Sequence, residues 1–107
     1  MWEKKLELYD KLVAKCPRFA RKGKANPYTS ANGHMFSMLN KEGQIGIRFS
    51  KEVQEKYIQE LGTTQFMSYG AVMQGYVLIP DPMLEDLDKL AEYLNESYDY
   101  IMTLHPK

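Results

Sequence analysis

The closing stretch of the chain, residues 81–104, limits the fold more than any other part of the sequence. Its apolar side chains recur at steps of three and four residues: Leu84, Leu87, Ala91, Leu94, Tyr98 and Ile101. This spacing places them along one side of an α-helix. The opposite side is acidic and is formed by Glu85, Asp88, Glu92, Glu96 and Asp99. Asp81 suits an N-cap and Pro82 the first helical position, so we expect one long helix that must bury its apolar side.

Residues 2–16 predict a second amphipathic helix at the other end of the chain. Its apolar side consists of Trp2, Leu6, Tyr9, Val13 and Cys16. Pro17 should end this helix, because proline removes a backbone donor and restricts the residue before it. Two such helices need an apolar surface to cover, which the middle of the chain has to supply.

The middle of the chain begins with a predicted β-hairpin over residues 28–39, YTSANGHMFSML. Asn32–Gly33 tolerates positive φ at both central positions of a two-residue turn. A second turn is expected around Gly43. The next segment, residues 44–49, alternates between isoleucine or phenylalanine and polar residues or glycine, as in a strand with one buried face.

A central helix is predicted over residues 51–61, between a capping Ser50 and a terminating Gly62. Two more strands follow, TQFMSYG and MQGYVLIP, with Ala71–Val72 expected near their turn and Pro80 at the end of the second. The order of elements is therefore α-β-β-β-α-β-β-α.

The short connections require antiparallel pairing of neighbouring strands. The sequence predicts an α+β fold: a two-layer sandwich of an antiparallel five-stranded sheet with helices packed mainly on one face. A chain of 107 residues is expected to form one domain, residues 1–107.

Charge is distributed unevenly, although the formal net charge is zero. Residues 1–24 hold eight Lys or Arg against three Asp or Glu, whereas residues 81–107 hold two against seven. One interpretation is that the two ends attract each other or form solvated faces. The single cysteine excludes an internal disulfide and a thiolate zinc cage. A charged N-terminus and the lack of a long apolar run predict no signal peptide, no membrane partner and a cytoplasmic location.

A nucleic-acid interface is the other interpretation of the basic start. Five cations lie within ten residues: Lys15, Arg18, Arg21, Lys22 and Lys24. Phe19 and Tyr28 are close enough in sequence to serve as stacking platforms. Phosphate binding requires cations on one surface, and binding of single strands adds aromatic side chains.

No catalytic residue, metal ligand or cofactor site is predicted. His34 and His105 have no acidic or thiol neighbour at ligand spacing, and Cys16 closes an apolar stripe. No glycine-rich phosphate loop precedes a helix. An enzyme or small-ligand binder would require a pocket that places His34 or Cys16 beside a carboxylate.

Several short motifs resemble the TfoX N-terminal domain family. They are NGHMFSML, QIGIRFS, LGTTQF, GYVLIPDPML and YIMTLHPK, and their order and spacing carry the resemblance over about residues 10–107. The family is named for a bacterial competence regulator, and many members are small stand-alone proteins without assigned activity. The resemblance implies a fold similar to the YjbR and type III secretion-chaperone folds, without catalytic residues. The family's MFGG-like start of the first strand is replaced here by KANPYTS.

These observations lead to the expectation of a non-enzymatic, regulatory or protein-binding domain. The partner would be another protein or a second copy, seated on the sheet face opposite the helices. The reason is that residues 35–39 alternate Phe36 and Met38 with Met35 and Leu39, so that both faces of that strand are apolar. Nucleic-acid binding through residues 15–24, and ligand binding or catalysis, are the alternatives.

Overall fold

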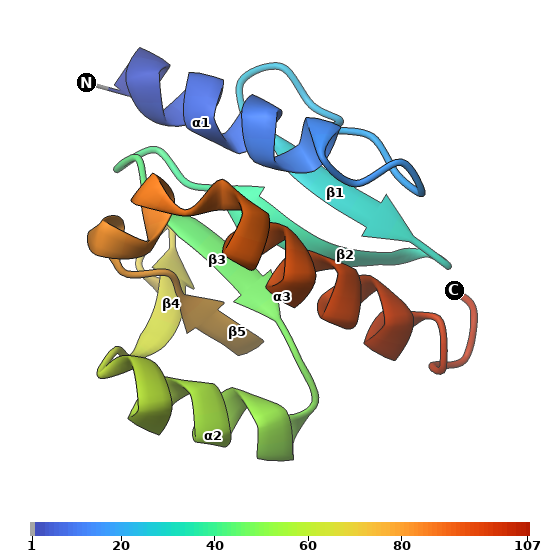
Figure 1. Ribbon diagram of the computed structural model, residues 1–107. Helices are drawn as coiled ribbons and strands as arrows, with labels where there is room; N and C mark the ends of the chain where they lie inside the picture. The colour runs from blue at the N-terminus through green and yellow to red at the C-terminus, as the bar shows by residue number, and fades with distance from the viewer. Residues whose placement is uncertain (1) are drawn as a thin grey trace.

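A computed structural model describes residues 2–107 as three α-helices on a five-stranded sheet (Figure 1). The helices are α1 (Trp2–Ala14), α2 (Lys51–Leu61) and α3 (Leu87–Ile101). The strands are β1 (Tyr28–Ala31), β2 (His34–Leu39), β3 (Ile45–Arg48), β4 (Gln65–Ser68) and β5 (Ala71–Leu78). All neighbouring strands are antiparallel, in the order β1-β2-β3-β5-β4. The predicted fold class is confirmed.

The main core lies between the sheet and the helices, which all contribute to it. In Figure 1, α1 and α3 lie side by side across the strands, and α2 lies at the end of the sheet formed by β4 and β5. Leu90 and Leu94 of α3 and Tyr9 and Leu12 of α1 are fully buried. Within residues 2–107, no helix has the length and apolar composition needed to cross a bilayer.

Two tight turns connect the hairpins. Asn32 and Gly33 have φ values of 55° and 79°, as the sequence predicted for a two-residue turn. Asn32 also holds the end of α3, because its side-chain amide donates to the carbonyl oxygens of Ile101 and Leu104 at 3.0 and 2.9 Å. The β4–β5 turn is formed by Tyr69 and Gly70, directly before Ala71.

The helix boundaries agree with the sequence for α2 and differ for α3. The Ser50 hydroxyl accepts from the Val53 amide at 3.3 Å, and Gly62 ends α2 with a φ of 63°. The prediction of a single helix capped by Asp81 is wrong. Residues Asp81–Glu85 form a 3₁₀ helix, and Asp86 caps α3 instead. Asp81 is bonded to Lys5 at 2.9 Å, so it is engaged by an element far away in sequence rather than by its own helix.

A β-bulge in β2 changes which residues share a face. Thr29 pairs with Ser37 and Ser30 with Met35, which leaves Phe36 without a partner on β1. Consequently Phe36 and Ser37 both point toward the helices: Phe36 packs in the main core, and the Ser37 hydroxyl bonds to Tyr9 Oη at 2.7 Å. Both faces of β2 are apolar as expected, but Phe36 and Met38 lie on opposite sides of the sheet.

The sheet is curved, and this curvature gives its second face a small core of its own. Met38, Phe66 and Tyr76 are buried there. Pairing of β4 with β5 shifts between Gln65 and Met67, close to Gly75, whose φ is 83°. Phe66 covers Gly46 of β3 so closely that a Cβ atom at Gly46 would lie 2.4 Å from its ring. The face expected to hold a partner is therefore partly filled by the chain itself.

Candidate binding surfaces

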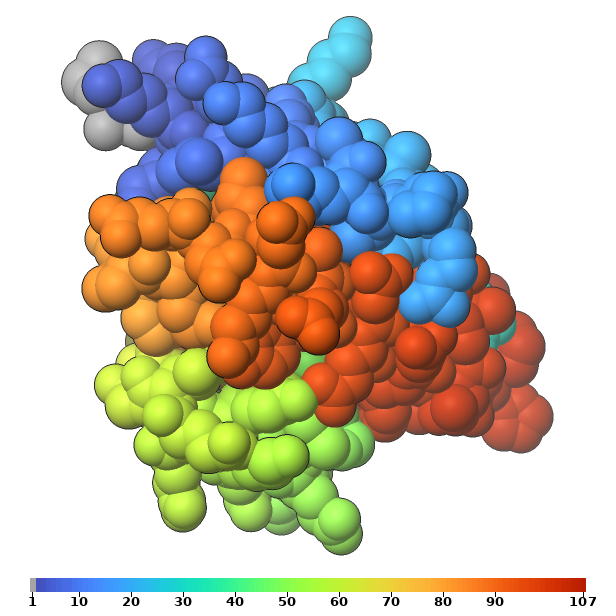
Figure 2. Space-filling view, viewed as in Figure 1, coloured from blue at the N-terminus to red at the C-terminus, as the bar shows by residue number. Residues whose placement is uncertain are grey.

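The basic segment after α1, residues 15–24, lies against α3 (Figure 2) and is ion-paired with its acidic side. Arg18 Nη1 is 2.7 Å from Asp99 Oδ1, and its guanidinium carbon is 4.4 Å from the centroid of the Tyr98 ring. Lys15 Nζ is 2.8 Å from Asp88 Oδ1. The attraction between the two ends of the chain thus takes the form of direct ion pairs.

The remaining cations of this segment divide into one that is paired and two that are not. Arg21 donates to both carboxylate oxygens of Asp10, at 2.8 and 3.3 Å. Lys22 Nζ donates to Ser30 Oγ at 3.1 Å, and its backbone pairs with that of Tyr28. Across residues 2–107, neither Lys22 nor Lys24 has a carboxylate within 4.0 Å. The segment therefore offers two of its five cations to an outside phosphate, and nucleic-acid binding remains a prediction.

Cys16 is not arranged as a nucleophile. Its side chain is buried, and the amide of Asn95 donates toward its sulfur at 3.6 Å. Burial raises the pKa of the Cys16 thiol above its ordinary value, which disfavours the reactive thiolate. Cys16 and Asp10 both line a hollow of about 430 Å³, but the carboxylate of Asp10 is bonded to Arg21. The geometry gives the thiol no free base.

The two histidines lie close together, where β2 begins. His34 Nε2 and the backbone oxygen of His105 are 2.8 Å apart. Residues 2–107 contain no cluster of three or more His, Cys, Asp or Glu side chains that could hold a metal ion. The structure thus places His34 beside a backbone carbonyl rather than beside Cys16.

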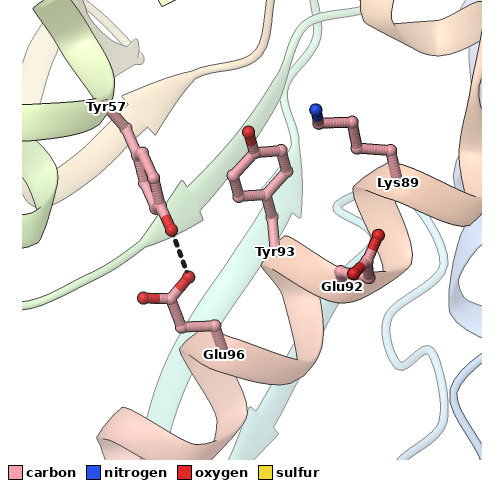
Figure 3. A pocket seen from close by; sticks show the side chains of 5 residues that line it. All are labelled: Tyr57, Lys89, Glu92, Tyr93 and Glu96. Carbon is pink, nitrogen blue, oxygen red and sulfur yellow. Dashed lines mark hydrogen bonds between the residues drawn. The ribbon is translucent and has the colours of Figure 1, made fainter. Parts of the chain in front are cut away.

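A hollow of about 390 Å³ separates α2 from α3 (Figure 3). Tyr57 of α2 reaches across it and donates to Glu96 of α3 at 2.5 Å, while Tyr93 lies between Tyr57 and Lys89. The Tyr57 and Tyr93 rings meet edge to face with centroids 4.8 Å apart. Burial, and then the hydrogen bond to Glu96, raise the pKa of Tyr57, so its proton is retained. These contacts join α2 to α3.

The β4–β5 hairpin carries the main exposed apolar surface. Among residues 2–107, four large hydrophobic side chains are exposed, and three belong to this hairpin: Met67 at 47%, Tyr69 at 64% and Val72 at 47%. Met67 and Val72 are direct cross-strand partners. We call these three residues the hairpin patch. An exposed apolar cluster of this kind is typical of a contact surface.

Tyr69 occupies a backbone conformation that a bulky residue rarely adopts. Its φ is 53°, in the left-handed region. Holding an L-residue there costs about 1 kcal/mol. Its hydroxyl bonds to Asn26, and the Lys41 ammonium lies 5.7 Å from its ring centroid. A large aromatic side chain is thus presented at a position where glycine or asparagine would be less strained.

The sequence contains a signal for this surface that its short motifs do not include. Residues 62–80 hold no charged side chain at all. Natural sheet edges are usually protected by charged residues, bulges or prolines. Here the edge strand β4 is covered at one point by Asn40, whose amide donates to the Met67 carbonyl at 3.0 Å. The backbone edge is partly blocked, whereas the Met67 and Val72 side chains remain open.

Comparison with known proteins adds no relative, since neither the protein-family models nor the curated proteins searched contain a match to this chain. The resemblance to the TfoX N-terminal domain family therefore remains a prediction from sequence motifs.

Proposed function

We propose that this chain is a non-enzymatic, TfoX N-terminal-like interaction domain of the bacterial cytoplasm that binds a second copy of itself through the hairpin patch. The observation that carries the proposal is the concentration of exposed Met67, Tyr69 and Val72 on one hairpin. Burial of apolar surface is the main driving force of protein association. The two-residue turn requires positive φ at Tyr69, so the presence of a large aromatic residue there, instead of glycine or asparagine, supports a role in binding.

A second copy is the partner that the charge pattern favours. In a two-fold symmetric contact, each patch meets the same patch of the other copy, so charged groups close to the axis would approach their own equivalents. Residues 62–80 contain no charge, and this contact would therefore meet no like-charge repulsion from the hairpin. A hairpin without charges also offers no ion-pair partner to a strongly acidic or basic protein.

The non-enzymatic part of the proposal rests on the surroundings of the two side chains that could have acted as nucleophile or base, Cys16 and His34. Cys16 is a buried thiol and His34 is bonded to a backbone oxygen. The rings and carboxylates between α2 and α3 join two helices and do not converge on a reacting atom.

Sedimentation velocity over a range of micromolar concentrations tests the proposal. The native chain should sediment increasingly as a dimer, and the double variant Met67→Lys/Val72→Lys should remain a monomer. Met102→Lys is the matched control, because Met102 is equally exposed but lies beyond α3. Retention of native circular dichroism by each variant would show that the change affects association alone. A native chain that stays monomeric at every concentration, or a double variant that dimerises normally, would refute the proposal.

A further inference from the structure

A shallow hollow of about 310 Å³ lies on the second face of the sheet. It is bounded by His34 at the start of β2, Arg48 at the end of β3, Gln74 and Tyr76 of β5, and Lys107. None of the side chains that line it is a carboxylate. The hollow does not use the residues of the hairpin patch.

Two cationic side chains reach this hollow without an anionic partner. Across residues 2–107, no carboxylate lies within 4.0 Å of the Arg48 guanidinium or the Lys107 ammonium. This distinguishes Arg48 from Arg18 and Arg21, which are both ion-paired. The positive charge of Arg48 is therefore not neutralised by another side chain.

Arg48 is held in place although it has no ion pair. Its side chain is half-buried, and its guanidinium carbon lies 5.9 Å from the centroid of the Tyr100 ring. Gly75 provides room for it, because a Cβ atom there would lie 3.3 Å from Arg48 Cγ. A guanidinium supported in this way loses less conformational entropy on binding than a free surface arginine.

Tyr76 adds a buried donor that no described residue satisfies. The residue is only 4% exposed, and its hydroxyl has no hydrogen-bond partner. Burial raises its pKa, with Arg48 acting in the opposite direction, so the group stays protonated and able to donate. An unsatisfied buried hydroxyl is unfavourable unless something accepts its hydrogen bond.

We infer that this hollow binds a small oxyanion, either a carboxylate or a phosphate group, with Arg48 as the main anchor. The planar guanidinium of Arg48 matches both groups, since each presents two oxygens to a pair of N–H donors. Tyr76 would supply a third hydrogen bond and Gln74 an amide donor. Because the hollow and the hairpin patch share no residue, anion binding can be tested independently of dimerisation.

The test is a pair of titrations followed by ¹H–¹⁵N correlation spectra at constant ionic strength, one with inorganic phosphate and one with succinate. We expect saturable shifts confined to the amides around residues 34, 48, 74 and 76, together with the Arg48 side-chain signal. Shifts with phosphate only would assign a phosphate site, and shifts with succinate only a carboxylate site. Shifts with both would assign a general oxyanion site. No saturable shift at these positions with either anion would overturn the inference.

Matched variants separate a specific site from general charge attraction. Arg48→Met keeps an apolar stem and should weaken binding at least tenfold, whereas Lys24→Ala removes an equal charge elsewhere and should leave affinity unchanged. Equal weakening by the two variants would overturn the inference. Tyr76→Phe should keep or raise the melting temperature and weaken binding several-fold. Tyr76→Phe serves as the folding-neutral variant if Arg48→Met is unstable. Unchanged affinity in Tyr76→Phe would show that the Tyr76 hydroxyl does not contact the anion.

Discussion

The basic segment, residues 15–24, and the β4–β5 hairpin differ in whether their surface side chains have partners within the fold. In the first region Lys15, Arg18 and Arg21 are matched by Asp88, Asp99 and Asp10. In the second region no residue between 62 and 80 is charged, and three apolar side chains face solvent. The comparison teaches that a run of charged residues can be paired within the fold and so be less available to a partner. A neutral segment, in contrast, can leave apolar side chains exposed to one.

The largest effect on the free energy of unfolding should come from the core beneath α3, the helix that contacts the basic segment. Leu94 of α3 is fully buried, and Leu94→Ala should lower the free energy of unfolding by about 3 kcal/mol through lost burial and a residual cavity. Urea denaturation measures this. Met102→Ala, on an exposed residue just after the same helix, is the control and should change stability by less than about 0.5 kcal/mol. Similar losses in both variants would contradict the placement of α3.

The second-largest effect should come from disturbing the contact between Phe66 of β4 and Gly46 of β3. In Gly46→Ala the added methyl group would overlap the Phe66 ring, and stability should fall by about 1–3 kcal/mol. A second variant, Gly46→Ala/Phe66→Leu, should recover part of this loss because the smaller side chain makes room. Thermal unfolding of both variants checks the prediction. Absence of any recovery would mean that the strain lies elsewhere.

The ion pairs of the basic segment should have a smaller effect on stability. Arg21→Met should destabilise the fold by about 1 kcal/mol or less, since its pair with Asp10 is partly exposed to solvent. The loss should shrink as salt is added. Lys24→Met is the control and should be neutral, because Lys24 has no carboxylate partner within residues 2–107. Equal effects from the two variants would remove the distinction between paired and free cations.

The same comparison sharpens the nucleic-acid alternative. If residues 15–24 bind nucleic acid, the double variant Lys22→Ala/Lys24→Ala should weaken binding of a single-stranded oligonucleotide and flatten its salt dependence. Fluorescence anisotropy at several salt concentrations measures both. A native chain without measurable affinity would end this alternative.

The smallest effect on stability should come from the tip of the hairpin. Tyr69→Asn should keep the free energy of unfolding or raise it by up to about 1 kcal/mol, because asparagine tolerates positive φ. The same variant should weaken self-association. Denaturation and sedimentation together test this. A clear loss of stability with unchanged association would mean that Tyr69 serves folding alone, through its bond to Asn26.

Local signals were enough to predict most of the fold. Asn32–Gly33, Ser50 and Gly62 each act on the backbone next to them, and the structure places each as predicted. The 3₁₀ helix at Asp81–Glu85 was missed, and so was the bond between Asp81 and Lys5, which no local pattern reveals. The bulge at Phe36 was also missed, since it depends on pairing with β1.

The candidate surfaces were harder to predict, for the same reason. The sequence displays the charge of Arg18 and Arg21 but not the carboxylates that meet them in the fold. It also displays an uncharged segment, but only the curvature near Gly75 and the packing of Phe66 decide which of its side chains are buried. The hollow at Arg48 joins residues from three strands with the final lysine, and no spacing along the chain indicates it.

Amide hydrogen exchange at increasing protein concentration tests most directly the contrast between a paired basic segment and an open hairpin. The account predicts that exchange in residues 65–72 slows as the concentration rises, while exchange in residues 15–24 stays constant. Exchange in residues 65–72 that does not depend on concentration, or slowing that appears in residues 15–24 instead, would contradict it.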